Sequence, residues 1–354
     1  MTTDALFQPL QLGDLALRNR IVMAPMTRNR ASPDGTPTPM MAEHYGQRAG
    51  AGLIVAEGTW PSATGQAYCR QPGIETAGHI AGWRRVTDAV HARGGLIVLQ
   101  VMHGGRIGSQ RIKPPGVASV APSALRAAGE VWTDAAGMQP YDEPQALSLD
   151  DVRAVAAEHG AAAHKARQAG FDGVELHGTS GYLPMQFLSS STNQRTDVYG
   201  GNAAARARFA VECLQAMAQA IGAGRVGLRL NPGNTYNDTS DEDSAATHAE
   251  LMRQVAPLGL AYLHVMKAPV PEIDAFALAR AHFGERLIVN DGFTPETAAA
   301  TVAAGAAQAV SFARHFIGNP DLAERIRAGL ALARFDRKTL YTAGEAGYTD
   351  YPTA

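Results

Sequence analysis

Short runs of β-branched and apolar residues recur along the chain, and longer Ala-rich stretches with helical spacing lie between them. This alternation is typical of repeated βα units around a parallel sheet. Eight parallel strands can close into a (β/α)8 barrel, whereas a doubly wound open sheet would leave two edges to protect. We count eight such runs: Arg20–Ala24, Leu53–Glu57, Leu96–Val101, Gly173–Leu176, Val226–Leu230, Tyr262–Val265, Leu287–Asn290 and Ala309–Phe312.

The stretches between the runs predict helices and one long excursion. Ser148 with Asp151 resembles a capping box, and Thr294 precedes Pro295 at a first helical position. The segment His103–Leu149 is rich in Pro, Gly and Ser, and a loop of this length in a compact domain is usually functional. We expect a lid, with a hairpin in it, over the top of the barrel. The predicted helices are Gly78–Arg93, Asp150–Gln168, Asn202–Ile221, Asp241–Ala256, Pro271–Phe283, Pro295–Ala304 and Pro320–Leu332.

Composition narrows the class of protein. The 354 residues fit one α/β barrel, no shift in composition marks a boundary, and residues 1–354 are therefore predicted to form a single domain. A net charge of -2 with scattered basic residues argues against nucleic acid. Cys69 and Cys213 do not suggest a disulfide scaffold, and neither a leader nor a membrane-spanning run is visible. We expect a cytoplasmic protein without a membrane partner, either a monomer or a homodimer.

Polar residues end or directly follow several of the strands. In a (β/α)8 barrel the carboxyl ends of the strands form the active site. Arg229 at such an end needs a partner, which an anionic or acceptor-rich ligand would supply. The alternative is a structural ion pair of Arg229 with Glu57 or Glu175. The polar strand ends are Thr27, Glu57, Gln100, His103, Glu175, His177, Arg229 and Asn231.

The loops after the seventh and eighth strands suggest a phosphate site. Asn290–Thr294 leads into a helix, and Phe312–His315 brings Arg314 close to it in this fold. Backbone N–H groups at a helix start and a nearby arginine bind phosphate in many barrels of this type. The alternative is that Gly292 only allows a turn.

The densest group of polar residues is His177–Tyr182, directly after the fourth strand. A histidine can donate a hydrogen bond to a substrate oxygen and a tyrosine can deliver a proton, so the pair suits activation of a carbonyl-like acceptor. The alternative is that His177 caps the barrel core and Tyr182 packs in a loop. No metal-ligand spacing, nucleophile elbow or dinucleotide fingerprint is present, so no metal is expected and a nicotinamide cofactor would be a visiting substrate.

Taken together, these segments resemble the old yellow enzymes, FMN-dependent reductases of activated alkenes on a TIM barrel. The resemblance covers nearly the whole chain. It is carried by Leu15–Arg28, His177–Phe187, Asn193–Asn202, the two phosphate loops, Ile317–Leu322 and Gly347–Pro352.

The resemblance implies a bound FMN and a set of residues around it. Thr27 would donate to the flavin O4 and tune its redox potential, and Arg229 would place positive charge by N1 and O2. Tyr68, Met102 and Tyr351 would line the substrate side. The flavin ring would be held by Pro25, Thr27, Gly58, Gln100 and Arg229, and the phosphate by Gly292, Phe293, Ala313 and Arg314.

The mechanism that the resemblance implies is ping-pong. NADPH or NADH reduces FMN and leaves, and an electron-poor alkene such as an α,β-unsaturated carbonyl, a maleimide or a nitroalkene then binds over the same face. His177 and Ser180 would bind its oxygen, flavin N5 would give hydride to the β-carbon, and Tyr182 would protonate the α-carbon.

Three residues depart from the family pattern. Ser180 stands where the family has Asn or sometimes His, and Met102 where many relatives have Trp. Ala313 replaces a usual Gly, which requires a negative φ at that position. Two other functions remain open. One is a flavin-free aldolase or isomerase that acts on a phosphate-bearing ligand, with Lys267 as its catalytic candidate, and the other is an FMN protein whose alkene reduction is impaired by Ser180.

Overall fold

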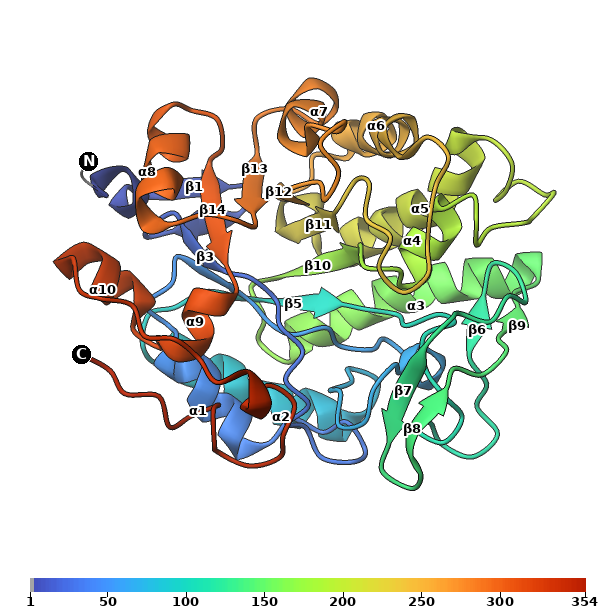
Figure 1. Cartoon of the computed structure of the whole chain (residues 1–354), viewed down its shortest axis with the longest axis horizontal. Helices are drawn as coiled ribbons and strands as arrows, with labels where there is room; N and C mark the ends of the chain where they lie inside the picture. Colours follow the sequence, from blue (N-terminus) through green and yellow to red (C-terminus); the bar gives the residue numbers. More distant parts are fainter. Residues whose placement is uncertain (1–2) are drawn as a thin grey trace.

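The computed structural model describes residues 3–354 and contains a closed barrel of eight parallel strands (Figure 1). Around the barrel the order is β10-β11-β12-β13-β14-β3-β4-β5, so chain order is kept throughout. Each predicted run overlaps one strand, which confirms the predicted (β/α)8 fold. The strands are β3 (Ile21–Met23), β4 (Leu53–Val55), β5 (Ile97–Val101), β10 (Gly173–Gly178), β11 (Val226–Leu230), β12 (Tyr262–Met266), β13 (Leu287–Asn290) and β14 (Ala309–Phe312).

Helices surround the barrel, with short helical turns in the connections. Ser148 and Thr294 accept hydrogen bonds from the backbone N–H groups three residues on, so the two predicted helix starts are confirmed. The α-helices are α1 (Pro39–Gln47), α2 (Ala77–His91), α3 (Leu149–Gln168), α4 (Leu183–Leu188), α5 (Ala203–Ile221), α6 (Ser244–Val255), α7 (Ala275–His282), α8 (Pro295–Ala303), α9 (Arg314–Gly318) and α10 (Leu322–Ala328). The 3-10 turns are η1 (Asp4–Phe7), η2 (Ala63–Gly65), η3 (Ala223–Arg225), η4 (Ala256–Leu258) and η5 (Arg337–Thr339).

Three predicted helices are shorter than expected, and local capping explains each case. The helix predicted from Asp241 begins at Ser244 because the Asp243 carboxylate caps the first turn. The helix predicted from Pro271 begins at Ala275, where Asp274 caps it in the same way. The last predicted helix ends at Ala328 because Gly329 takes a left-handed conformation, with φ of 65°.

A short hairpin at the start of the chain closes the amino end of the barrel. Strands β1 (Leu10–Leu12) and β2 (Leu15–Leu17) pair in antiparallel register. Leu12, Leu15 and Leu17 are buried in one cluster with barrel residues such as Val98 and Ile288. The barrel is therefore sealed at this end, and its open end is where the carboxyl ends of the strands lie.

The excursion after β5 contains the predicted hairpin. Strands β7 (Glu130–Thr133) and β8 (Gly137–Pro140) are antiparallel, and Figure 1 shows them at the edge of the molecule. Two-residue strands β6 (Val120–Ala121) and β9 (Gln145–Ala146) tie the base of the excursion together. Within residues 3–354 no helix has the length and apolar character needed to cross a membrane.

Candidate active site

A cavity of about 590 Å³ lies at the carboxyl ends of the barrel strands. We call it the inner cavity. Its walls contain residues from the two groups that the sequence predicted, which are the polar strand ends and the two phosphate loops. The predicted residues that line it are Pro25, His177, Ser180, Arg229, Gly292, Phe293, Ala313 and Arg314.

The guanidinium of Arg229 is buried at the floor of the inner cavity. Its Nη2 donates to Asn290 Oδ1 at 2.8 Å, and its Nη1 contacts the ring of His264. His264 lies between Arg229 and Glu175, because its Nδ1 is 2.9 Å from Glu175 Oε2. Its Nε2 is 2.7 Å from Ser311 Oγ. Among the described residues, no carboxylate contacts Arg229 directly.

The hydrogen bonds also show the partners of Glu175 and Glu57, the two carboxylates that the sequence offered to Arg229. Burial alone would raise the pKa of Glu175, but His264 and Arg229 outweigh it and the pKa is lowered. Glu57 lies elsewhere, where it accepts from the Tyr45 hydroxyl and from the Arg28 backbone N–H. Burial raises the pKa of Glu57 to about 7. A direct ion pair of Arg229 with either carboxylate, which the sequence left open, is absent among the described residues.

The phosphate loops have the backbone that the sequence requires. Gly292 has φ of 80° with open space around its α-carbon, so it serves a turn and lines the inner cavity at once. Ala313 has φ of -97°, the negative value under which Ala can replace Gly. Arg314 is exposed and pairs with Asp291 at 3.1 Å.

The ring of His177, which lines the inner cavity, contacts the ring of Tyr182. Their rings are 4.9 Å apart at an angle of 76°, an edge-to-face contact. The backbone N–H of Thr179 lies 3.4 Å from His177 Nδ1, which makes Nδ1 an acceptor and leaves the N–H on Nε2. Burial and, to a lesser extent, the charge on Arg229 lower the pKa of His177 to about 3, so the ring is neutral.

Tyr182 lines a larger outer cavity of about 930 Å³, and Ala313 and Arg314 line both this cavity and the inner one. Its hydroxyl is hydrogen-bonded to that of Tyr68 at 2.9 Å, and Thr27 lines the same space. Burial raises the pKa of Tyr182 above that of a free tyrosine, so its proton is retained at neutral pH.

Ser180 has a strained backbone, with φ of 58°. Asn adopts this left-handed conformation more readily than Ser does. The hydroxyl of Ser180 is 3.1 Å from that of Thr179, and its carbonyl accepts from Asn237 Nδ2 at 2.8 Å. The adjacent Gly181 must be Gly, because a Cβ there would lie 2.4 Å from the Tyr236 carbonyl oxygen.

Four residues predicted for the flavin and substrate sites line neither cavity, namely Gly58, Gln100, Met102 and Tyr351. Met102 packs on Gly58, where a Cβ would meet its sulfur at 2.3 Å. Gln100 donates to Glu175 Oε1 at 2.8 Å, and neither residue lines the inner cavity. Tyr351 accepts from the Asp336 backbone N–H at 2.9 Å. Lys267, the candidate of the aldolase alternative, is exposed and lines neither cavity.

Sequence reasoning missed His264 and the aromatic rim of the outer cavity. The only signal for His264 was a single polar residue within the apolar run Tyr262–Val265. The rim comes from segments that are far apart in the chain, namely the β7–β8 hairpin, the loop after β11 and the segment that follows α10. Its large exposed side chains are Trp132, Met138, Tyr236 and Tyr341.

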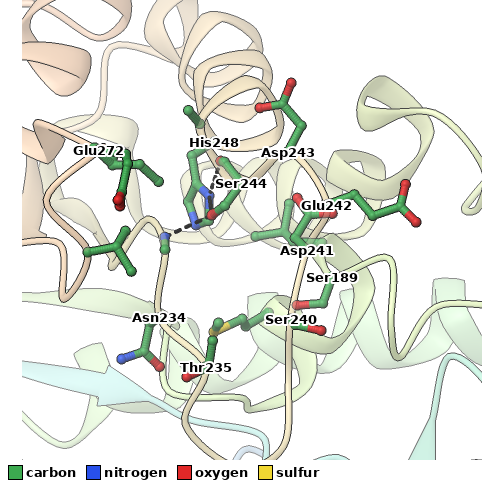
Figure 2. A pocket seen from close by; sticks show the side chains of 16 residues that line it. Ser189, Asn234, Thr235, Ser240, Asp241, Glu242, Asp243, Ser244, His248 and Glu272 are labelled. Atoms are coloured by element: carbon green, nitrogen blue, oxygen red, sulfur yellow. Dashed lines mark hydrogen bonds between the residues drawn. The ribbon is translucent and has the colours of Figure 1, made fainter.

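A third cavity, of about 440 Å³, lies near α4 and the start of α6 (Figure 2). Its polar groups serve the local structure, since Ser244 Oγ accepts from Gly233 N–H at 2.8 Å and His248 Nδ1 donates to the Ser244 carbonyl at 2.7 Å. Figure 2 shows Asp241 and Glu272 at its edge. None of the site residues predicted from the sequence lines this cavity.

Comparison with known proteins shows the family of the chain. The model of the NADH:flavin oxidoreductase / NADH oxidase family matches residues 5–333. A probable flavin mononucleotide-dependent alkene reductase from Leishmania infantum is 42% identical, over 99% of this chain and 97% of the relative. The 12-oxophytodienoate reductase 1 of Oryza sativa subsp. japonica is 38% identical, over 98% of this chain and 92% of the relative.

Solved structures of similar proteins have the same fold over nearly the whole chain. Morphinone reductase in complex with tetrahydroNAD has a TM-score of 0.94 and 43% identity, over 99% of this chain and 97% of that one. The old yellow enzyme from Trypanosoma cruzi has a TM-score of 0.95 and 34% identity, over 99% of both chains. With its eight-stranded barrel and buried Arg229, the chain belongs to the NADH:flavin oxidoreductase / NADH oxidase family, in its old yellow enzyme branch.

Proposed function

We propose that this flavin oxidoreductase reduces electron-poor alkenes with hydride from NADPH or NADH. The observation that carries the proposal is the His177–Tyr182 pair, which stands where the inner and outer cavities meet. The inner cavity suits a cofactor, and the outer cavity gives an acceptor access to both side chains.

FMN is the cofactor of this family, and the inner cavity has the chemistry to hold it. No carboxylate of the described residues contacts the buried Arg229, so an electron-rich group above it would balance the charge of the guanidinium. Gly292, Phe293, Ala313 and Arg314 offer backbone N–H groups and a cation to a phosphate at the other side of the cavity. When bound, FMN supplies the hydride chemistry, taking hydride from the nicotinamide and passing it to the alkene.

His177 binds and orients the acceptor in this proposal. Its neutral ring carries a proton on Nε2, which donates to a carbonyl or nitro oxygen. This bond withdraws electron density from the alkene and favours hydride addition at the β-carbon. Ser180 lines the same wall but has one hydroxyl hydrogen where an Asn would have two.

Tyr182 is the proton donor in this proposal. Its raised pKa keeps the proton at neutral pH, and Tyr68 can stabilise the phenolate left after transfer to the α-carbon. The excursion hairpin supplies Trp132 and Met138 to the outer cavity. We propose that it limits access of water there, which is the lid role expected from the sequence.

The test is to measure the two half-reactions of Tyr182→Phe separately by stopped-flow absorbance. Reoxidation of the reduced flavin by an enone should slow by about 100-fold or more, because general-acid catalysis is lost. Flavin reduction by NADPH should stay near the wild-type rate. Tyr199→Phe is a matched control, since it is a buried tyrosine whose hydroxyl binds Glu212 away from both cavities. An equal loss in both half-reactions would contradict the proton-donor role.

A further inference from the structure

One layer of the barrel interior, which forms the floor of the inner cavity and lies directly beneath it, is polar instead of apolar. Six adjacent strands each contribute one side chain to this layer, and all six are at most 6% exposed. The residues are Gln100 on β5, Glu175 on β10, Arg229 on β11, His264 on β12, Asn290 on β13 and Ser311 on β14. Buried charges persist only where each has a partner, so the pattern of partners shows what the layer does.

His264 uses both of its ring nitrogens within this layer. Burial and, to a lesser extent, the neighbouring charge on Arg229 lower its pKa to about 4, so the ring is neutral and has one N–H. Nδ1 lies 2.9 Å from a carboxylate oxygen of Glu175, which can only accept, so the proton is on Nδ1. The Ser311 hydroxyl then donates to Nε2 at 2.7 Å.

Arg229 contacts the same ring in a different way. Its Nη1 is 3.0 Å from Nδ1 and 2.9 Å from Nε2. A nitrogen at equal distances from both, if it lay in the plane of the ring, would overlap the carbon between them. Nη1 therefore lies over one face of the imidazole, with an N–H directed at the ring, a contact in which the ring supports the positive charge.

His264 thus separates a buried cation from a buried anion. One edge of the ring binds Glu175 and one face supports Arg229. Without the ring, the strongest donor near Glu175 would be Arg229 itself, and the guanidinium would turn down from the cavity to pair with the carboxylate.

We propose that His264 is a positioning residue that keeps the charge of Arg229 directed at the cofactor and so sets the reduction potential of the bound flavin. This inference rests on the proposed FMN site. Reduction places negative charge on the flavin, and a guanidinium that faces it stabilises the reduced form more than the oxidised form.

The experiment measures the midpoint potential and the dissociation constant of FMN in loaded protein, with no alkene present. In His264→Leu, the preference of the protein for reduced over oxidised FMN should fall about tenfold. The midpoint potential should therefore fall by about 30 mV, the value of a tenfold change for a two-electron couple. Glu175→Gln should raise the potential, because the carboxylate no longer offsets Arg229. His264→Asn keeps a donor near Nδ1 and should recover most of the loss.

The double variant Glu175→Gln with His264→Leu makes the test specific. If His264 acts by separating the two charges, removal of the carboxylate abolishes the need for it, and the double variant should have at least the wild-type potential. It also has no unpaired buried carboxylate, so it carries the test if His264→Leu does not fold.

The control is His159→Leu, a histidine in α3 that is equally buried and bonds only to a backbone carbonyl. It should lower the melting temperature without moving the potential. A wild-type potential in His264→Leu, or a potential as low in the double variant as in His264→Leu, would overturn the proposal. Failure of the wild-type protein to bind FMN would instead contradict the proposed function.

Discussion

The floor of the inner cavity and the rim of the outer cavity, which we call the mouth, differ in how their side chains are held in place. On the floor, strands of the barrel place six side chains that are at most 6% exposed, and hydrogen bonds fix their orientation. At the mouth, Trp132, Met138, Tyr236 and Tyr341 come from a hairpin and two loops and are 50% to 62% exposed. Strand-held side chains position a ligand more accurately than loop-held ones do.

This contrast teaches which part of the chemistry is constant and which is adjustable. A floor held by the barrel suits one cofactor in one orientation. Exposed apolar side chains around a cavity mark a binding surface, and loops can exchange them without disturbing the core. We therefore expect changes on the floor to affect flavin binding, and changes at the mouth to affect only the choice and the binding of the acceptor.

The largest expected effect is on the floor, for Arg229→Met. This change removes the cation that faces the cofactor and leaves Glu175 with His264 and Gln100 alone. Loss of a charge-assisted hydrogen bond of about 3 kcal/mol corresponds to roughly 100-fold weaker FMN binding. Titration of the apoprotein with FMN, followed by flavin fluorescence, measures this. Affinity within threefold of wild type would show that Arg229 does not contact the cofactor.

Ser180→Asn tests the junction of floor and mouth. Asn tolerates the left-handed backbone at this position and offers a second amide hydrogen to the acceptor. One added hydrogen bond of about 1.4 kcal/mol would tighten binding of a phenolic ligand about tenfold. The charge-transfer absorbance of the flavin–phenol complex gives the dissociation constant. Unchanged or weaker binding would mean that residue 180 is not the second donor.

Trp132→Ala tests the mouth alone. The indole is more than half exposed and lies on the excursion hairpin, so the barrel should keep its stability. We expect KM to rise a few-fold for bulky acceptors and to stay nearly constant for cyclohexenone, with no change in FMN affinity. Weaker FMN binding in Trp132→Ala would contradict the expectation that the mouth does not affect the cofactor.

The smallest expected effect concerns pH. The pKa of His177 is lowered to about 3, so its ring gains a proton only as the pH falls through that value. Tyr182 has a raised pKa and keeps its proton. Enone binding should therefore be flat between about pH 5 and 8, although a free histidine titrates near 6.5 in that range. A titration near pH 6.5 that disappears in His177→Asn would contradict a neutral donor.

The sequence was sufficient to predict the features that depend on local chemistry. Eight apolar runs gave the strands, Ser148 and Thr294 marked helix starts, and the polar strand ends placed Arg229 and His177 in one cavity. The requirement for a negative φ at Ala313 was also met. These features follow from residue type, periodicity and the geometry that a closed barrel imposes.

The features that were missed depend on contacts between segments far apart in the chain. The role of His264 appears only when β10, β12 and β14 bring Glu175 and Ser311 to its two nitrogens. The left-handed backbone of Ser180 is set by a loop that includes Asn237. The motif around Tyr351 suggested the substrate side, yet its hydroxyl binds the Asp336 backbone.

The most direct test of the account is the oxidative half-reaction of the wild-type protein. FMN-loaded protein is reduced anaerobically with NADPH, and then mixed in a stopped-flow instrument with an enone, a maleimide or a nitroalkene. We predict that the flavin absorbance returns in a single turnover and that the saturated product forms in equal amount. Rapid reduction by NADPH without reoxidation by any of the three acceptors would contradict alkene reduction at the His177–Tyr182 pair.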